Sequence, residues 1–204
     1  MQLNSILSLT LALGLSAGCY PVKVPDLTAY LPSDVVPNMR WDTHPEAAGW
    51  TRSTLLAVAA RDIDLALTVP ADITIFCPHY AKATLNDRRA FWVGLLSATA
   101  KYESGFNPAA VGGGGKYIGL MQISPRTAQH YHCKASTPAA LKNGSANLAC
   151  AVAIFAPHVA KDGLVVGAGN RGIGRDWGPY RSKAVRTEIA GWTSRQSYCQ
   201  PAPP

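Results

Sequence analysis

Apolar residues recur at three- and four-residue spacing in several stretches of this chain of 204 residues, which predicts a mainly helical protein. Pro70 and Pro157 mark places where a helix should stop or kink, because proline lacks the backbone N–H. Ser124 and Pro125 suit an N-cap and a first helical position. Strand-like alternation is weak, so only a short β-ribbon is expected, around residues 109–123. The expected helices cover residues 50–69, from Asn86-Asp87 as cap to Tyr102, from Ser124-Pro125 onward, from Ser145 to Pro157, and about 180–192.

The two ends of the chain differ in composition from this helical middle. Residues 1–18 hold an apolar run that is too short for a permanent membrane span and that predicts a signal peptide. Residues 19–49 are rich in proline and poor in periodicity, which predicts a linker, and residues 194–204 are expected to form a tail. Between them we expect a helical extension over 50–83 and the main domain over 84–193.

A short motif follows the N-terminal apolar run. Leu15-Ser16-Ala17-Gly18-Cys19 resembles a bacterial lipobox, which implies cleavage before Cys19 and attachment of lipid to that cysteine. Plain cleavage, which would leave a soluble protein, stays open as the alternative. In both cases we expect export. The protein would be periplasmic, either anchored by lipid to the outer membrane or free, or it would be secreted.

The cysteines fit an oxidising compartment. Of the five, Cys19 would go to the lipid, and the remaining even number favours disulfides. Histidines stand near two of them, but the spacings match no standard zinc module, so neither a metal site nor a cofactor is expected. Of the three possible pairings we favour Cys133 with Cys150 and Cys77 with Cys199.

Composition narrows the partners. Hydrophobic residues make up 48% of the chain, which is enough for a core and argues against global disorder. The formal net charge of +7 favours polyanionic partners, such as nucleic acid, acidic lipid or an acidic wall polymer. The Lys and Arg residues are scattered and form no nucleic-acid motif, so we expect no nucleic-acid partner.

Glu103 is the only Glu between residues 47 and 187. It lies near the C-terminal end of an expected helix, where the helix dipole disfavours negative charge, and Tyr102 and Phe106 flank it. Both features would raise its pKa toward the range that a general acid needs. The simpler alternative is a solvated residue at a helix end. Candidates for a second acid are few and lie in other segments: Asp87, Asp162 and Asp176.

Two sequence blocks carry a resemblance to a known family. Glu103-Ser104-Gly105-Phe106-Asn107-Pro108 and Gly119-Leu120-Met121-Gln122 resemble the signature of the lytic transglycosylase SLT family, which cuts the glycan strands of peptidoglycan. Asn147-Leu148 and the segment 169–175 resemble later motifs of the family. The resemblance covers roughly residues 84–190. It implies a mainly α, lysozyme-like (goose-type) domain with a helical N-terminal extension and a small β-ribbon or loop region near the cleft.

The resemblance also implies roles for single residues. Glu103 would be the single general acid and base for cleavage of the MurNAc-β-1,4-GlcNAc bond, with formation of 1,6-anhydro-MurNAc. Gly169 replaces an aromatic residue that helps to orient the acid in the family, and Tyr180 or Tyr117 are candidates to substitute for it. The residues expected to bind substrate are Ser104, Tyr117, Met121, Gln122, Asn170 and Tyr180.

Two other functions stay open. A muramidase-type hydrolase on the same fold would use water in place of the C6 hydroxyl of MurNAc. A non-catalytic protein for peptidoglycan binding or assembly would fit the loss of the aromatic residue at Gly169. The expected partners are peptidoglycan glycan strands and, through the N-terminal lipid, a membrane. An envelope-spanning machinery is a further option.

Overall fold

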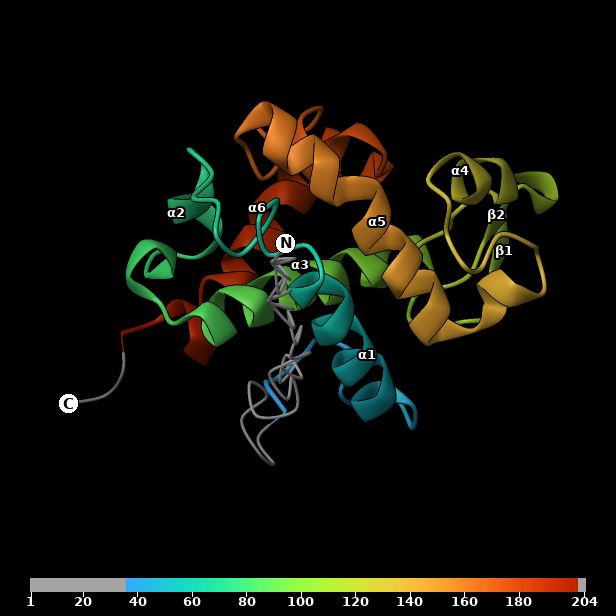
Figure 1. Ribbon diagram of the computed structural model, residues 1–204, viewed down its shortest axis with the longest axis horizontal. Coiled ribbons are helices and arrows are strands. Elements are labelled where there is room, and N and C mark those ends of the chain that lie inside the picture. Colours follow the sequence, from blue (N-terminus) through green and yellow to red (C-terminus); the bar gives the residue numbers. More distant parts are fainter. Residues whose placement is uncertain (1–35, 202–204) are drawn as a thin grey trace, which may run out of the picture. The chain divides into compact units, whose positions relative to one another are not determined.

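The computed structural model describes residues 36–201, which form helices and one small sheet (Figure 1). Strands β1 and β2 pair antiparallel, with Val111 opposite Ile118 and Gly112 opposite Tyr117. The mainly α fold with a small β-ribbon is therefore confirmed. The signal peptide, Cys19 and most of the predicted linker lie outside the described residues. The elements are α1 (Ala47–Ala59), α2 (Ile73–Phe76), α3 (Leu85–Glu103), β1 (Val111–Gly112), β2 (Tyr117–Ile118), α4 (Pro125–His130), α5 (Gly144–Asp162) and α6 (Lys183–Thr193), with short 3-10 turns at Tyr80–Lys82, Gly113–Gly115, Ala140–Lys142, Gly172–Arg175, Gly178–Arg181 and Ser197–Cys199.

Helix α3 forms the centre of the fold. Its residues from Arg89 to Ala100 are all buried, and both α1 and α6 pack against it (Figure 1). Its buried hydroxyls bond within the helix: Ser97 Oγ donates to a carbonyl 2.8 Å away, and Thr99 Oγ1 to one 2.7 Å away. These bonds satisfy the polar groups that the packing removes from water. The helix therefore presents its last residue, Glu103, from a firmly packed element.

Capping side chains determine where the helices begin. This explains why two helices start at other residues than predicted. The predicted start at Ser124 is confirmed, because its side chain accepts a hydrogen bond from the backbone N–H of Thr127. Helix α3 begins at Leu85, since Thr84 and not Asn86-Asp87 supplies the capping oxygen. Helix α5 begins at Gly144 and not at Ser145, because Asn143 is its cap.

The predicted helix over 50–69 is wrong in its second half, because α1 ends at Ala59 and turns follow. Ile63 and Leu67 continued the apolar pattern, yet they are 82% and 59% exposed and form no buried stripe. A long-range ion pair shapes this segment instead. The carboxylate of Asp62 accepts a 3.0 Å hydrogen bond from Nε of Arg89 on α3.

Helix α5 does not stop at Pro157, because it continues through this residue to Asp162. Gly163 is its C-cap and has φ of 62°. Pro157 is exposed, and Ala153, whose carbonyl loses its helical partner, is only partly buried. Water can therefore replace the missing bond. None of the helices within residues 36–201 is both long and apolar enough to cross a membrane.

Segments outside the predicted main domain also pack into the core. Met39 and Trp41 belong to the stretch predicted as a linker, yet both are buried, and Trp41 Nε1 donates to Thr51 at 2.9 Å. One disulfide joins Cys77 to Cys199, near the C-terminus, and the other joins Cys133 to Cys150. These are the pairings favoured from the sequence. The domain boundaries themselves stay predictions.

Candidate active site

Glu103 ends helix α3 and is partly buried. Burial raises the pKa of its carboxyl from 4.5 to about 7. Within the described part of the chain, no hydrogen bond or nearby charge acts on that carboxyl strongly enough to oppose the effect of burial. The protonated, neutral acid is therefore well populated at neutral pH.

Glu188 on α6 is the opposite case. Arg40 pairs with both of its carboxylate oxygens, the Tyr102 hydroxyl donates to it at 2.7 Å, and Lys101 Nζ lies 3.5 Å away. The hydrogen bonds from Arg40 are the main reason that the pKa of Glu188 falls to about 2. The two residues before Glu103 in the chain thus turn toward another carboxylate. Nothing in the sequence pattern singled out Arg40 or Glu188 for this arrangement.

Gln122 joins its own sequence block to Ala110, two residues after the end of the first block. Its Nε2 donates to the carbonyl of Gly119 at 2.9 Å and to that of Ala110 at 3.4 Å. The backbone N–H of Gly119 also donates to the Ala110 carbonyl, at 2.9 Å. A Cβ at Gly112 would lie 2.3 Å from Gln122 Oε1, so a larger residue at this position would displace the Gln122 side chain. The segment that follows Glu103 and the Gly-Leu-Met-Gln block therefore form one unit.

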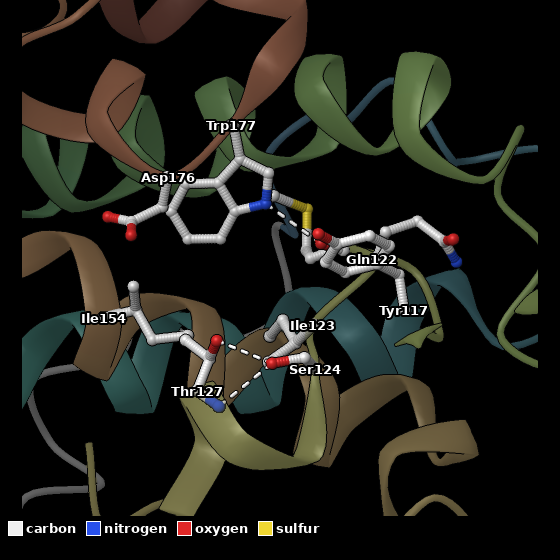
Figure 2. A pocket seen from close by; sticks show the side chains of 9 residues that line it. Tyr117, Gln122, Ile123, Ser124, Thr127, Ile154, Asp176 and Trp177 are labelled. Atoms are coloured by element: carbon white, nitrogen blue, oxygen red, sulfur yellow. Dashed lines mark hydrogen bonds between the residues drawn. The ribbon is translucent and has the colours of Figure 1, made fainter. Parts of the chain in front are cut away.

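A pocket lies against this unit (Figure 2). Tyr117 is 47% exposed there, and its ring covers Gly113, where a Cβ would come within 2.5 Å of the ring. Hydroxyls of Ser124 and Thr127, 2.7 Å apart, add polar atoms. A mixture of apolar and aromatic side chains with a few polar groups is typical of small-molecule binding sites. Its lining residues are Tyr117, Met121, Gln122, Ile123, Ser124, Thr127, Ile154, Asp176 and Trp177.

Asp176, which was considered from the sequence only as a weak candidate for a second acid, is among these lining residues. Its carboxylate lies 3.2 Å from Nε2 of His158, and that nitrogen lies 2.7 Å from the hydroxyl of Tyr131. Burial raises the pKa of Asp176, and nearby cationic groups oppose the rise. Asp162, by contrast, is held by Arg175 in an ion pair, and its pKa is strongly lowered. Asp176 is thus the acidic residue of the pocket.

Tyr180 was expected to contact substrate, but its side chain is completely buried. Its hydroxyl lies 2.6 Å from Oγ1 of Thr99, one helical turn before Glu103 on α3. Burial raises the pKa of Tyr180, and the negative charge of Glu103 adds to the rise, so the two side chains are electrostatic neighbours. Gly169 has φ of 105°, and a Cβ there would lie 2.0 Å from the Tyr180 carbonyl oxygen. The backbone packing therefore excludes any side chain at the position of the missing aromatic residue.

The other predicted site residues are spread around this region. Ser104 follows α3 as its C-cap, and its Oγ donates to the carbonyl of Ala100 at 3.3 Å. Met121 is buried and lines the pocket beside Gln122. Asn170 is exposed and does not line that pocket. Over residues 36–201 no group of three or more His, Cys, Asp or Glu side chains is arranged to hold a metal ion.

The family model described as the transglycosylase SLT domain matches residues 82–188, which is more than half of the chain. The chain therefore belongs to the SLT transglycosylase family, and this membership implies peptidoglycan as the substrate. Such proteins generally act outside the cytoplasm, which the two disulfides fit.

Solved structures give more particular relatives. The wild-type form 2 of Bd0314 DslA is 25% identical to the chain, with a TM-score of 0.72, and the match covers 81% of this chain and all of that one. Two Glu-to-Gln mutants of Bd0314 DslA match with 26% identity and TM-scores of 0.70 and 0.71, over 81% of this chain and 98% of theirs. A search of curated protein sequences found no match.

Proposed function

We propose that the protein is a peptidoglycan lytic transglycosylase with Glu103 as its single general acid and base. It would cleave the MurNAc-β-1,4-GlcNAc bond and leave a 1,6-anhydro-MurNAc end. The observation that carries the proposal is the partly buried Glu103 carboxyl, whose pKa of about 7 keeps much of it protonated at neutral pH. Of the two glutamates in the family match, Glu188 is unsuited to this role because its ion pairs keep it ionised.

The proposed reaction uses the same carboxyl twice. Protonated Glu103 gives its proton to the glycosidic oxygen, and the bond between that oxygen and C1 of MurNAc breaks. The N-acetyl group of the sugar stabilises the positive charge that develops at C1. The Glu103 carboxylate then takes the proton of the C6 hydroxyl, whose oxygen bonds to C1 and closes the anhydro ring. A pKa near neutrality serves both steps, because the group must hold a proton and then accept one.

Tyr180 is our candidate for the role of the missing aromatic residue. It lies under the face of α3 that carries Thr99, one turn before Glu103, and its pKa responds to the charge of Glu103. It would therefore support the acid from the protein side and not touch the sugar. Tyr117 and Gln122, at the exposed pocket, would contact the glycan strand.

The test is product analysis by mass spectrometry of muropeptides released from purified sacculi. Wild type should release products with anhydro-MurNAc ends, and Glu103→Gln should lower turnover by about 100- to 10,000-fold. Glu46→Gln is the matched control, because Glu46 is exposed and makes no side-chain cap bond at the start of α1. Unchanged turnover by Glu103→Gln would exclude the proposal and favour a peptidoglycan-binding protein.

The alternative is a muramidase-type hydrolase, and the position of Asp176 favours it. Ordinary glycosidases use two carboxylates, and Asp176 supplies a carboxylate to the pocket beside Gln122, a pocket whose lining does not include Glu103. A hydrolase would leave reducing MurNAc ends and would lose activity in Asp176→Asn. Anhydro ends that persist in Asp176→Asn support the transglycosylase.

We also propose export, with lipid on Cys19 as the anchor. Both disulfides support an oxidising compartment. Cell fractionation of wild type and Cys19→Ser tests the anchor, since loss of the lipid should move the protein from the membrane fraction to the soluble fraction. If wild type and Cys19→Ser were both found in the soluble fraction, plain cleavage without lipid attachment would be the explanation.

A further inference from the structure

We propose that Trp177 is a positioning residue that fixes the peptide between Met121 and Gln122 for glycan binding. The inference rests on the proposed function, because it takes the pocket beside this peptide as part of the glycan site. Figure 2 shows the indole of Trp177 among the side chains that line the pocket, and its Nε1 donates to the backbone carbonyl of Met121. Trp177 belongs to none of the sequence motifs that pointed to the site.

Both backbone polar atoms of Met121 are held by buried side chains from outside its loop. Trp177 is 3% exposed, and its Nε1 donates to the Met121 carbonyl at 2.9 Å. The Met121 N–H donates to Oδ1 of Asn147, which is fully buried on α5, at 2.8 Å. The Asn147 amide is itself fixed, because its Nδ2 donates to the carbonyls of Ile118 and Leu141 at 2.9 and 3.0 Å.

This clamp holds a backbone conformation that the sequence alone disfavours. Gln122 has φ of 47°, in the left-handed region that residues other than glycine rarely adopt. Rotation of the preceding peptide would relieve that conformation, and it would turn the Met121 carbonyl away from Trp177. The bonds from the Gln122 side chain to Gly119 and Ala110 depend on the same conformation. Trp177 therefore stabilises the shape of the pocket wall on which Gln122 lies.

Trp177 is itself placed by the element behind the pocket. Its ring meets that of Phe155 on α5 edge-on, with ring centroids 6.4 Å apart. Asn147 lies on the same helix. Helix α5 thus carries one arm of the clamp and packs against the other, so the pocket wall is fixed relative to a single helix. The hydroxyls of Ser124 and Thr127 and the carboxylate of Asp176 take no part in the hydrogen bonds that hold Met121.

The test is equilibrium binding of purified, uncrosslinked glycan strands to Glu103→Gln protein with and without Trp177→Phe. Phenylalanine keeps a ring but cannot donate to the Met121 carbonyl. Trp92→Phe is the matched control, because the buried Trp92 also donates through Nε1, at 2.9 Å, to the hydroxyl of Tyr80, which does not line the pocket. We expect about ten-fold weaker binding for Trp177→Phe and unchanged binding for Trp92→Phe, although both should lower Tm. In active protein, Trp177→Phe should raise KM more than it lowers kcat.

Equal affinities in the two variants, whether both unchanged or both weakened, would overturn the positioning role. Absence of glycan binding in the Glu103→Gln parent would overturn it as well, because the pocket would then not be a glycan site. The proposed function fails separately, through unchanged turnover in Glu103→Gln, and the comparison of KM between Trp177→Phe and Trp92→Phe in otherwise wild-type protein then tests the positioning role. Should Trp177→Phe not fold, benzothienylalanine at position 177 keeps the ring shape without the N–H and takes its place.

Discussion

Replacing Glu103 by Gln should make the protein more stable at pH 8 and leave its stability nearly unchanged at pH 4.5. In the folded protein Glu103 keeps its proton up to about pH 7, whereas an exposed carboxyl releases it near 4.5. Between these pH values the unfolded state binds fewer protons than the folded state, so the free energy of unfolding falls as pH rises. Above pH 7 the folded wild type carries the full cost of a poorly hydrated charge, which glutamine removes.

The magnitude follows from the two pKa values. Each pH unit between 4.5 and about 7 corresponds to about 1.4 kcal/mol, which gives roughly 3 kcal/mol for the whole interval. Because water reaches part of the Glu103 side chain, we expect about 2 to 3 kcal/mol. For a protein of this size, the gain corresponds to a rise in Tm of about 4 to 12 °C at pH 8.

Urea unfolding of both proteins at pH 4.5, 6 and 8, with the disulfides intact, measures this difference. Glu188→Gln is the control of opposite sign. The pKa of Glu188 is lowered to about 2, so its stabilising contribution is complete above pH 4.5 and disappears as pH falls toward 2. Glu188→Gln should therefore lose stability at pH 8. If the free energies of unfolding of wild type and Glu103→Gln differ by the same amount at pH 4.5 and 8, the desolvated acid does not exist and the catalytic assignment loses its basis.

Three further predictions concern activity, the backbone at the site and the disulfide near the C-terminus. Turnover should fall about ten-fold for each pH unit above about 7, since it needs protonated Glu103, and a rate that stays constant from pH 6 to 9 would contradict this. Gly169→Ala should cost about 2 kcal/mol or more, because the new Cβ would meet a backbone carbonyl at 2.0 Å. Gly114→Ala, which meets no atom within 4 Å, should cost only about 1 kcal/mol in the same urea unfolding assay, and equal losses would refute the steric argument. Replacing Cys77 and Cys199 by Ser should lower the free energy of unfolding by about 3 to 5 kcal/mol, because the disulfide closes a loop with a sequence separation of 122, and a loss under 1 kcal/mol would count against that entropic account.

The sequence predicts the elements whose apolar pattern agrees with their burial. Helices α3, α5 and α6 lie where that pattern predicts them, and their starts shift by one to three residues because capping side chains decide where each helix begins. The pattern fails after α1, where the contact of Asp62 with Arg89 replaces a helical continuation. Such a contact joins residues 27 positions apart and leaves no periodic signal.

Within the predicted linker, the described residues 36–49 depart from the expected spacer for a similar reason. Prolines suggested an extended spacer, but Trp41 within it is fully buried and bonds to Thr51. Two large apolar residues close together, Met39 and Trp41, were the available sign that this stretch joins the core. Proline content describes the backbone of a segment, whereas burial depends on what its side chains can reach.

The candidate site was predictable only as far as the motifs extend. Glu103 and Gln122 stand in recognisable blocks, whereas the position of Asp176 beside the pocket depends on how the chain returns after α5. The full burial of Tyr180 depends on packing against α3, which no local pattern encodes. Trp177 had one usable sign, a tryptophan within a glycine-rich and charged stretch where a core residue is unusual.

Glu103 at the end of α3 and Glu188 on α6 show how the fold assigns different chemistry to one residue type. Glu188 receives Arg40, Lys101 and the hydroxyl of Tyr102, and its pKa is about 2. Glu103 directly follows Lys101 and Tyr102 in the chain, but neither of them acts on its carboxyl. Burial is the cause of its pKa of about 7. The contacts of Arg40, Lys101 and Tyr102 with Glu188 account for the low pKa of one carboxyl, and burial accounts for the high pKa of the other. Chain position therefore does not decide the chemistry of these two residues, because the side chains just before Glu103 act on Glu188 instead.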